Sequence, residues 1–282
     1  MLPTKTAIKL WAGGLLEVFV PWITRDLDKG LNSGRFPKIK SWILQARAAR
    51  ARAGGDAGAL QKSLFQIWRA DTADAYFDQY LDRYQKWFLG PHHEIVDQLA
   101  LLSRSGAYSR MVEVGCGAGR VLEHCAAAMP EVASFTGVDI NPSIIARNKI
   151  DFAQNPRLQF LAADASTWLE QTAQPGTILM TYGGVMEYFA APTLASMFRS
   201  LAQTGPAAVA LVEPVDPAHD LAQDGASHAF GPENSFSHNH AKLLEAAGYV
   251  VTFHKTLHLG GASWVMLLAI SQFTPNLGYP EQ

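Results

Sequence analysis

Residues 112–120 read VEVGCGAGR, and this stretch decides the fold. An apolar run at 111–114 precedes three glycines, Gly115, Gly117 and Gly119, and a helical pattern follows them. In an open sheet of parallel strands, ligands bind beyond the carboxyl ends of the strands. Glycines at that point let the backbone turn sharply and approach a ligand closely. The stretch therefore predicts a ligand-cradling loop after the first strand of an α/β sheet.

Strand and helix patterns alternate from about residue 110 onward. Apolar runs typical of strands lie at 111–114, 134–139, 158–162, 177–181 and 207–212, with helical stretches near 118–128, 142–154, 166–171 and 190–203. This alternation indicates βαβ units and a mostly parallel, doubly wound sheet with helices on both faces. Two further β-rich runs, 249–257 and 263–271, are joined through LGGA (259–262) and predict a terminal antiparallel hairpin.

The first part of the chain lacks this alternation of strand and helix patterns. We expect an N-terminal helical extension over 1–104 and the α/β domain over 105–282. Residues 46–60, ARAARARAGGDAGAL, are low in complexity and predict either a helix ending at Gly54 or a mobile linker. Aromatic spacing from 61 to 104 is helical, and Pro91 after Gly90 ends that run.

Composition and charge limit the classes of function that the chain could have. The apolar fraction of 48% and the charged fraction of 17% are those of a core-forming protein, and two cysteines, Cys116 and Cys125, define no disulfide framework. We therefore expect a cytoplasmic protein. Residues 1–70 hold 12 Lys/Arg and 4 Asp/Glu, a balance of +8, whereas the rest of the chain carries −10. The acidic body argues against a nucleic-acid substrate, and the basic segment is either an arm for an anionic partner or helices packed on that body.

An apolar stripe marks the stretch IKLWAGGLLEVFVPWI (8–23). Ile8, Trp11, Leu15, Phe19 and Trp22 recur at three- and four-residue steps, which places them on one helix face. Glu17 interrupts the stretch, which is too short to span a membrane, and no clear signal-peptide pattern is present. The stripe predicts a core face, a dimer interface or a membrane-surface contact.

The spacing of the glycines separates two cofactor classes. The dinucleotide fingerprint is G-x-G-x-x-G, but the third fingerprint position here is Arg120. Glu113 precedes the loop, and its carboxylate would repel a pyrophosphate but suit a positively charged ligand. Both features disfavour an NAD-dependent oxidoreductase.

Acidic residues follow the next two strands. Asp139, in GVDINPS (137–143), lies 24 residues after Gly115, where a carboxylate can accept both hydroxyls of a ribose. Asp164, in LAADAS (161–166), can accept from an exocyclic amine such as that of adenine. Either aspartate is alternatively a helix cap, since Asn141-Pro142 opens one helix and Ser166 the next. The fourth strand runs into TYGGVMEYF (181–189), with a second glycine pair.

With VEVGCGAGR, GVDINPS, AADAS and YGGVMEYF in order, residues 105–272 resemble the class I S-adenosylmethionine-dependent methyltransferases. The resemblance implies a seven-stranded Rossmann-like sheet and S-adenosylmethionine as cofactor, with S-adenosylhomocysteine as product. It places Glu113, Gly115, Cys116 and Gly117 on the methionine and ribose side, and Asp139 on the ribose hydroxyls. Ile140, Asp164 and Ala165 would contact the adenine, and Tyr182 and Gly183 the methionine part. The alternative for Cys116 is a small filler, and for Gly119 helix–strand packing.

Methyl transfer from a sulfonium is an in-line displacement, so the protein mainly supplies alignment and a dry site. A hydroxyl acceptor needs a general base, whereas a neutral amine needs none. Our candidates for the base are His238, His219 and Glu187, on loops expected at the carboxyl edge, with Tyr188, Glu213, Asp216, Asp220, His228 and His240 nearby. Ser237 or Asn239 alternatively caps a helix beginning near Ala241, with His238 as its neighbour. His92-His93-Glu94 and His238-x-His240 resemble metal ligands only loosely, and no metal is predicted.

The acceptor is less defined than the cofactor. Tyr76, Phe77, Tyr80 and Tyr84, with Arg83, form an aromatic row suited to a lid over a small-molecule acceptor or to ordinary packing. We expect O- or N-methylation of a small molecule. The alternatives are an acceptor in a lipid or membrane, reached through the helix at 8–23, and a non-catalytic cofactor-binding subunit. The apolar stripe also leaves a homodimer open.

Overall fold

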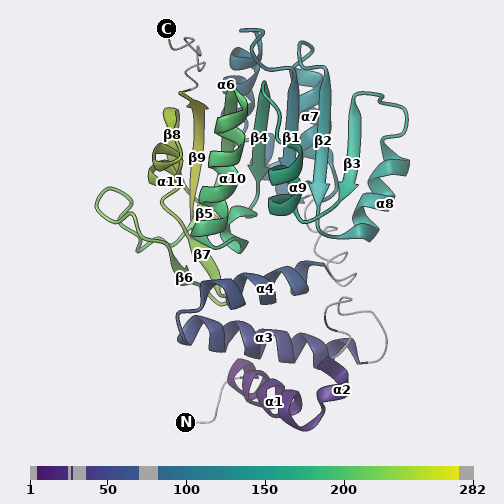
Figure 1. Ribbon diagram of the computed structural model, residues 1–282, viewed down its shortest axis with the longest axis vertical. Helices are drawn as coiled ribbons and strands as arrows, with labels where there is room; N and C mark the ends of the chain where they lie inside the picture. The colour runs from purple at the N-terminus through teal and green to yellow at the C-terminus, as the bar shows by residue number, and fades with distance from the viewer. Residues whose placement is uncertain (1–4, 25–26, 28–35, 70–81, 273–282) are drawn as a thin grey trace, which may run out of the picture.

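The computed structural model describes residues 5–24, 27, 36–69 and 82–272. A seven-stranded sheet forms its centre, in the order β3-β2-β1-β4-β5-β9-β8 (Figure 1). The first five strands of this order are parallel, and β9 runs antiparallel to both β5 and β8. The bounds are β1 (Arg110–Val114), β2 (Ser134–Asp139), β3 (Leu158–Ala162), β4 (Thr177–Tyr182), β5 (Ala207–Val215), β8 (Tyr249–Leu259) and β9 (Ala262–Ser271). The predicted doubly wound sheet and its terminal hairpin are confirmed.

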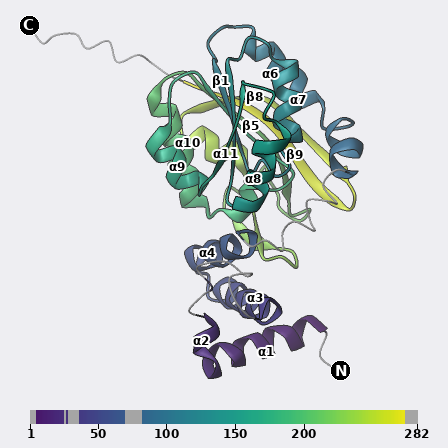
Figure 2. The ribbon, with the colours of Figure 1, turned by 90° about the vertical axis from the view of Figure 1, so that its right-hand side faces the viewer.

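Helices cover both faces of this sheet, as Figure 2 shows. One face carries α6 (Glu94–Ser103), α7 (Arg120–Ala128) and α8 (Pro142–Asp151), and the other carries α9 (Ala165–Thr172), α10 (Ala191–Thr204) and α11 (His240–Ala246). Successive side chains of a strand point to opposite faces. Met111 of β1 accordingly packs with the first helix group, and Val112 and Val114 pack with the second.

A second, two-stranded sheet lies beside the carboxyl end of β5. It consists of β6 (His228–Phe230) and β7 (Ser235–Ser237), which are antiparallel. The sequence did not predict this hairpin, because three-residue strands are too short for a period-two pattern to stand out. The hairpin matters for the site, since β7 packs against the short helix η4 (Met186–Tyr188) that follows β4.

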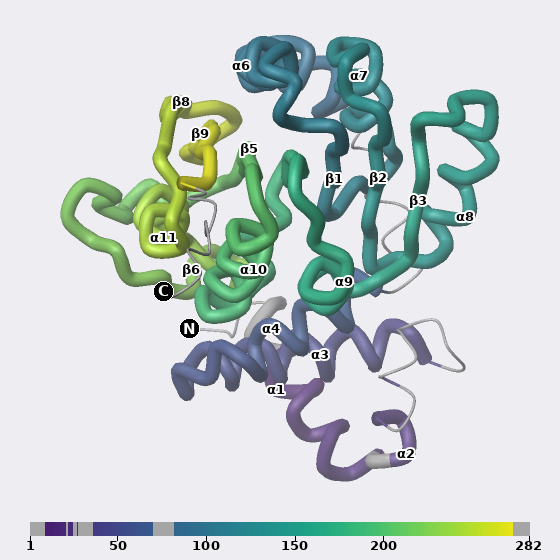
Figure 3. The backbone as a smooth tube through the Cα atoms, turned by 45° about the horizontal axis from the view of Figure 1, so that its top comes forward, coloured from purple at the N-terminus to yellow at the C-terminus, as the bar shows by residue number. Residues whose placement is uncertain are grey.

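The N-terminal helices stack below the carboxyl ends of β1–β5. They are α1 (Lys5–Phe19), α2 (Pro21–Thr24), α3 (Pro37–Ala53) and α4 (Ala57–Trp68), and α4 lies nearest the sheet with α3 and α1 successively farther away (Figure 1). Figure 3 shows the same helices gathered on one side of the molecule. Helix α3 ends at Ala53 with Gly54 as its cap, so the first of the two readings of this segment, a helix ending at Gly54, is confirmed.

The aromatic segment before β1 is only partly described. Tyr76, Phe77 and Tyr80 of the predicted lid row lie outside the described residues. Tyr84 begins the short π-helix η3 (Tyr84–Phe88), where its ring stacks on Phe88 at 5.3 Å. Among the helices in the described part of the chain, none combines the length and apolar character that a bilayer span requires.

Candidate functional site

A pocket opens at the carboxyl edge of the parallel strands, between the sheet and α4. It encloses about 790 Å³ of empty space, counted with its open mouth. Residues from the ends of β1, β2, β3 and β4 line one side, and residues of α4 and η4 line the other. The lining comprises Phe65, Trp68, Val114, Gly115, Gly117, Val138, Asp139, Ile140, Ala163, Ala165, Tyr182, Gly183, Gly184, Val185, Tyr188 and Phe189. Seven of the ten predicted cofactor residues are therefore brought together here.

The glycine loop has the backbone conformation that its sequence predicted. Gly115, Gly117 and Gly119 have φ angles of 68°, 45° and 73°, which side chains of L-residues rarely tolerate. A Cβ on Gly115 would lie 2.6 Å from Val185, so this glycine lets the loop after β1 meet the loop after β4. A Cβ on Gly119 would instead meet Phe152 and Phe160. Gly119 thus serves helix–strand packing, and the other two glycines line the pocket.

Asp139 ends β2 and joins two of the predicted motifs. Its Oδ2 accepts from the backbone N–H of Gly117 at 3.0 Å, and its Oδ1 accepts from that of Asn141 at 2.9 Å. Burial raises the pKa of this carboxyl, and the backbone N–H donors oppose that rise. Asn141, not Asp139, caps α8, since its side chain accepts from the N–H of Ser143. Asp139 is left to orient the glycine loop and to face the pocket.

Glu113 and Cys116 lie beneath the loop and outside the pocket lining. Glu113 is fully buried, and its carboxyl oxygens form no hydrogen bond of good geometry within the described residues. Burial, followed by the neighbouring Asp139, raises the pKa of Glu113 well above its usual value. Burial likewise raises the pKa of the Cys116 thiol, which packs against Gly137 as a small filler would. Glu113 is therefore a buried carboxyl that forms no hydrogen bond of good geometry within the described residues, and it lies below the glycine loop.

Two of the three predicted adenine contacts line the pocket. Ile140 and Ala165 do so, with Val138 and Ala163 beside them. Asp164 takes the alternative role of a helix cap: its Oδ1 accepts from the backbone N–H and the hydroxyl of Ser166, at 3.0 and 2.6 Å. The adenine contact of Asp164 stays a prediction, while its capping of α9 is observed.

A buried carboxylate fixes the loop after β4. Glu213 of β5 accepts from the Thr181 hydroxyl at 2.5 Å and from the backbone N–H groups of Val185 and Met186 at 2.8 and 3.0 Å. Burial raises the pKa of Glu213 to about 7, although these donors favour its charged form. Gly183 and Gly184, both with positive φ, lie in the loop that Glu213 holds. The pocket wall formed by 182–185 is thereby anchored to the neighbouring strand.

Glu187 is the candidate base that lies nearest the pocket wall. A Cβ added to Gly184, which lines the pocket, would clash with Oε1 of Glu187. The residue is 8% exposed, and burial raises its pKa to about 8, with Glu213 and Glu233 adding to the rise. A carboxyl that titrates near neutrality can accept or donate a proton at working pH. Glu187 does not line the pocket itself, but it lies next to the pocket wall and has the titration range of an acid–base group.

The two histidine candidates are engaged elsewhere. His238 is buried, with Nδ1 at 2.6 Å from the Ser227 hydroxyl and Nε2 at 3.0 Å from the carbonyl of Phe189. Burial lowers its pKa to about 4, so the ring is neutral and Nε2–H donates to Phe189. His219 contacts the Ser237 hydroxyl through Nδ1 at 2.8 Å, while its Nε2 is buried without a partner in the described residues. Neither ring lines the pocket.

The other predicted groups near β5 and α11 are structural neighbours. His240 is buried at the start of α11, with Asn239 as its cap. His228 bonds to Asp216 at 3.1 Å. Among the described residues, His219, Asp224 and His228 are the three whose ligand-type atoms all lie within 4.8 Å of one another. His219 and Asp224 lie on the segment after β5 and His228 begins β6, and none of the three lines the pocket. His92, from the other loose metal motif, is buried against the Tyr182 hydroxyl at 3.2 Å.

Sequence reasoning missed the aromatic wall of the pocket. Phe65 and Trp68 of α4 meet Phe189 and Tyr188, with ring centroids 4.9 and 5.0 Å apart. The signal was present in the helical spacing of Phe65 and Trp68, but spacing does not reveal which helix lies over the sheet edge. The wall is apolar on both sides of the contact and closes the pocket opposite the strand ends.

Strand order, the hairpin and the glycine loop together define the class: a Rossmann-like methyltransferase fold. The sequence agrees, because residues 111–205 match the family model described as a methyltransferase domain. Residues 111–205, about a third of the chain, are therefore a methyltransferase domain. Among curated proteins, no sequence matches the chain significantly.

Solved structures with the same fold have little sequence in common with this chain. Magnesium protoporphyrin IX methyltransferase from Synechocystis PCC 6803 with bound S-adenosylhomocysteine is 17% identical, covers 74% of this chain and 99% of its own, and gives a TM-score of 0.52. The same enzyme with bound S-adenosylmethionine is 15% identical, covers 71% of this chain and 95% of its own, and gives a TM-score of 0.47. An S-adenosylmethionine-dependent methyltransferase from Clostridium acetobutylicum is 9% identical, covers 69% of this chain and 98% of its own, and gives a TM-score of 0.49. The first of these supports the fold.

The lining suits the cofactor chemically. Asp139 offers carboxylate oxygens for hydroxyl groups, and the apolar side chains of Val138, Ile140 and Ala165 suit a planar base. The buried carboxyl of Glu113 forms no hydrogen bond of good geometry within the described residues, and a positively charged amino group nearby would favour its ionised form. These residues fit S-adenosylmethionine, which when bound supplies an electrophilic methyl group on a cationic sulfur.

Proposed function

We propose that the protein transfers a methyl group from S-adenosylmethionine to an oxygen or nitrogen of a small, largely apolar acceptor. One observation carries the proposal: a single pocket joins the motif-bearing strand ends to an aromatic wall from α4 and η4. Ligand pockets are typically apolar with a few convergent polar groups. The strand-end side suits the cofactor, and the aromatic side is left for the acceptor.

On the cofactor side, each residue has a proposed role. Asp139 accepts from the ribose hydroxyls while holding the Gly117 N–H. Ile140 and Ala165 pack on the adenine. Tyr182 and Gly183 approach the methionine part, and its positive charge would favour the ionised form of the Glu113 carboxyl below the loop.

On the acceptor side, the aromatic rings orient the substrate and exclude water. Phe65, Trp68, Tyr188 and Phe189 present ring faces and edges without a charged group among them. Holding two reactants in line converts a bimolecular step into an effectively unimolecular one, and alignment alone can supply roughly 7–11 kcal/mol of the barrier. The aromatic wall therefore favours an acceptor with an apolar or aromatic body.

For a hydroxyl acceptor, Glu187 is the proposed proton acceptor. It lies against Gly184 at the pocket wall, and its pKa of about 8 leaves part of the carboxyl ionised at neutral pH. A base with a pKa near the working pH combines availability with strength. An amine acceptor that arrives neutral would not need this group, so the dependence on Glu187 separates the two chemistries.

The acceptor wall is tested by removing its α4 half. We expect the double variant Phe65→Ala/Trp68→Ala to raise the KM for an apolar acceptor by about tenfold or more, because two aromatic contacts are lost. Binding of S-adenosylhomocysteine should change much less. The measurement is labelled-methyl transfer to a panel of phenols, alcohols and amines, with titration of S-adenosylhomocysteine on the same samples.

Lys62→Ala supplies the control, since Lys62 is exposed on the same helix. An unchanged KM in the double variant would show that the acceptor does not use this wall. Cofactor binding without transfer to any member of the panel would move the protein toward a non-catalytic cofactor-binding subunit.

A further inference from the structure

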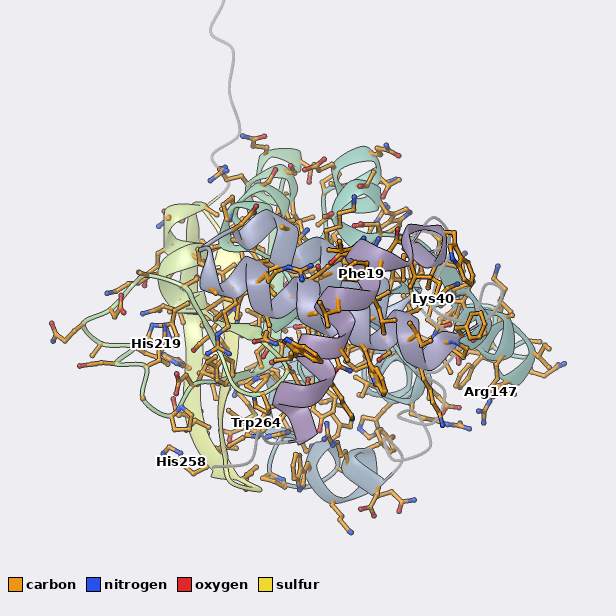
Figure 4. The ribbon with its side chains drawn as sticks, turned by 90° about the horizontal axis from the view of Figure 1, so that it is seen from below. Phe19, Lys40, Arg147, His219, His258 and Trp264 are labelled. Atoms are coloured by element: carbon orange, nitrogen blue, oxygen red, sulfur yellow. The ribbon has the colours of Figure 1, made fainter. Side chains whose placement is uncertain are left out.

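The outer face of α1 is an exposed apolar stripe. Trp11, Val18 and Phe19 are 71%, 71% and 76% exposed, Leu15 is 39% exposed, and Trp22, on the following helix α2, is 56% exposed. The steps from 11 to 15, 18 and 19 place the four α1 residues on one side of that helix. Figure 4 looks onto this end of the molecule, with α1 in purple across the front and Phe19 labelled on it. These exposed residues do not form a core face, which was one of the three predictions for the stripe.

The inner face of α1 is already used. Gly13 lets α1 approach α3 so closely that a Cβ there would lie 2.2 Å from the Trp42 carbonyl oxygen. Leu16 and Val20 pack on the small core that contains Ile43 and Leu44. A helix that is apolar on both faces is normally buried on both. Here the second face has no cover within the described residues.

The stripe extends beyond α1 at one end. The ring of Trp22 meets that of Phe36 edge-on at 5.9 Å, and Phe36 is itself 43% exposed. Contiguous exposed apolar patches of this kind mark interaction surfaces, whereas single exposed apolar residues do not. We refer to Trp11, Leu15, Val18, Phe19, Trp22 and Phe36 as the outer stripe.

Exposed lysines lie near both ends of the outer stripe. Lys9 and Lys38 are exposed at its two ends. Glu17 is the single acidic residue in the described parts of α1, α2 and α3, and it is paired with Arg47 at 2.7 Å and with Arg50. The layer therefore presents apolar aromatic side chains flanked by cations, without a free anion on α1.

This charge pattern decides between two occupants. A second copy of the chain in a twofold dimer would bring the same patch against itself and set Lys9 and Lys38 near cations of the partner. An anionic bilayer attracts those cations and accepts Trp and Phe at its interface. We infer that the outer stripe docks on an anionic lipid surface, with α1 lying in the plane of the interface.

The docking surface and the pocket are connected by the stack of N-terminal helices. Helix α1 packs on α3, α3 packs on α4, and α4 supplies Phe65 and Trp68 to the pocket wall. A protein seated on α1 would thus hold the pocket on the far side of the α1, α3 and α4 stack from the membrane surface. This step rests on the proposed function: the acceptor is then an apolar molecule that partitions into the bilayer.

Vesicle co-sedimentation of the full-length protein tests the docking without requiring activity. The variant is Val18→Glu/Phe19→Glu, which adds charge at two exposed positions and leaves the inner face of α1 unchanged. The control is Leu101→Glu/Ile150→Glu, which makes the same change at apolar positions 65% and 77% exposed on α6 and α8. The vesicles are phosphatidylcholine with and without phosphatidylserine, at low and high salt.

We expect wild type and control to sediment with phosphatidylserine vesicles, and the α1 variant to lose affinity by about tenfold or more. High salt should weaken the binding of wild type, because the cationic contribution is screened. Equal sedimentation of all three proteins, or none by wild type, would overturn the inference. A wild-type dimer in solution that Val18→Glu/Phe19→Glu dissociates, with no lipid binding, would assign the stripe to a second copy instead.

S-adenosylhomocysteine titration on the same samples separates this inference from the proposed function. Retained cofactor binding without vesicle binding removes only the docking. Vesicle binding without cofactor binding removes the methyltransferase and leaves the docking in place.

Discussion

Glu187 is a candidate base whose buried environment changes its ordinary chemistry. Its folded-state pKa is about 8 against a usual 4.5, because burial disfavours the charged form. A raised pKa of an acid contributes stability that is fully present below about pH 4.5 and is lost as pH rises through about 8. We therefore expect Glu187→Gln to melt at a higher temperature than wild type at pH 9, with a much smaller difference at pH 5. Thermal unfolding at the two pH values measures this.

Glu245→Gln is the matched change at an exposed glutamate on α11. Its melting temperature should follow wild type at both pH values. The same shift for Glu187→Gln at pH 5 and pH 9 would contradict the buried, protonated state of Glu187.

Residues fixed by local sequence were predictable, and those fixed by distant partners were not. Gly115 and Asp139 are read from a motif of a few residues around each, and both reach the pocket. Asp164 was open to two roles because capping and ligand contact both need an aspartate before a helix. The pKa of Glu187 could not be read from sequence, since Ser235, Glu213 and Glu233, all of which shift it, come from later segments.

At the scale of elements, the loop between β4 and η4 depends on one carboxylate. Replacing Glu213 by Ala would leave the Thr181 hydroxyl and the N–H groups of Val185 and Met186 buried without an acceptor. Each unsatisfied group costs roughly 1–3 kcal/mol. We expect Glu213→Ala to lower the free energy of unfolding by about 3 kcal/mol or more and to weaken S-adenosylhomocysteine binding, as measured by urea unfolding and calorimetric titration.

Glu213→Gln retains one carbonyl oxygen as acceptor and should lose less stability than Glu213→Ala. If the alanine variant unfolds at the same urea concentration as wild type, the loop is held by something other than Glu213.

Long periodic elements were predicted to within a few residues, whereas short ones were missed. Each strand of the main sheet is an apolar run bounded by turn residues, so its sequence identifies it. The β6–β7 hairpin has three residues in each strand and forms because it packs on η4 and β5. The placement of α4 over the pocket follows from tertiary packing of the helical layer, which helical spacing alone does not encode.

Over the whole molecule, charge and apolar surface are divided between two parts. The basic helical layer carries the exposed outer stripe, and the acidic α/β part carries the glycine loop and the strand ends of the pocket. The sequence revealed the charge division and the stripe, but it left core, dimer and membrane contact open for the latter. Which face of α1 is covered depends on the close approach at Gly13, a feature of packing.

Calorimetric titration of S-adenosylhomocysteine into wild type, Asp139→Ala and Asp151→Ala tests whether the pocket at the strand ends binds this cofactor, with NAD as a second ligand. Asp151 is on the helix that follows β2 and pairs with Arg147 outside the pocket. The account predicts binding in the micromolar range, on the order of −8 kcal/mol, by wild type and Asp151→Ala, with no response to NAD. It also predicts a loss of about tenfold or more in Asp139→Ala, with circular dichroism confirming its fold. Folded wild type that binds neither S-adenosylhomocysteine nor S-adenosylmethionine would contradict the account.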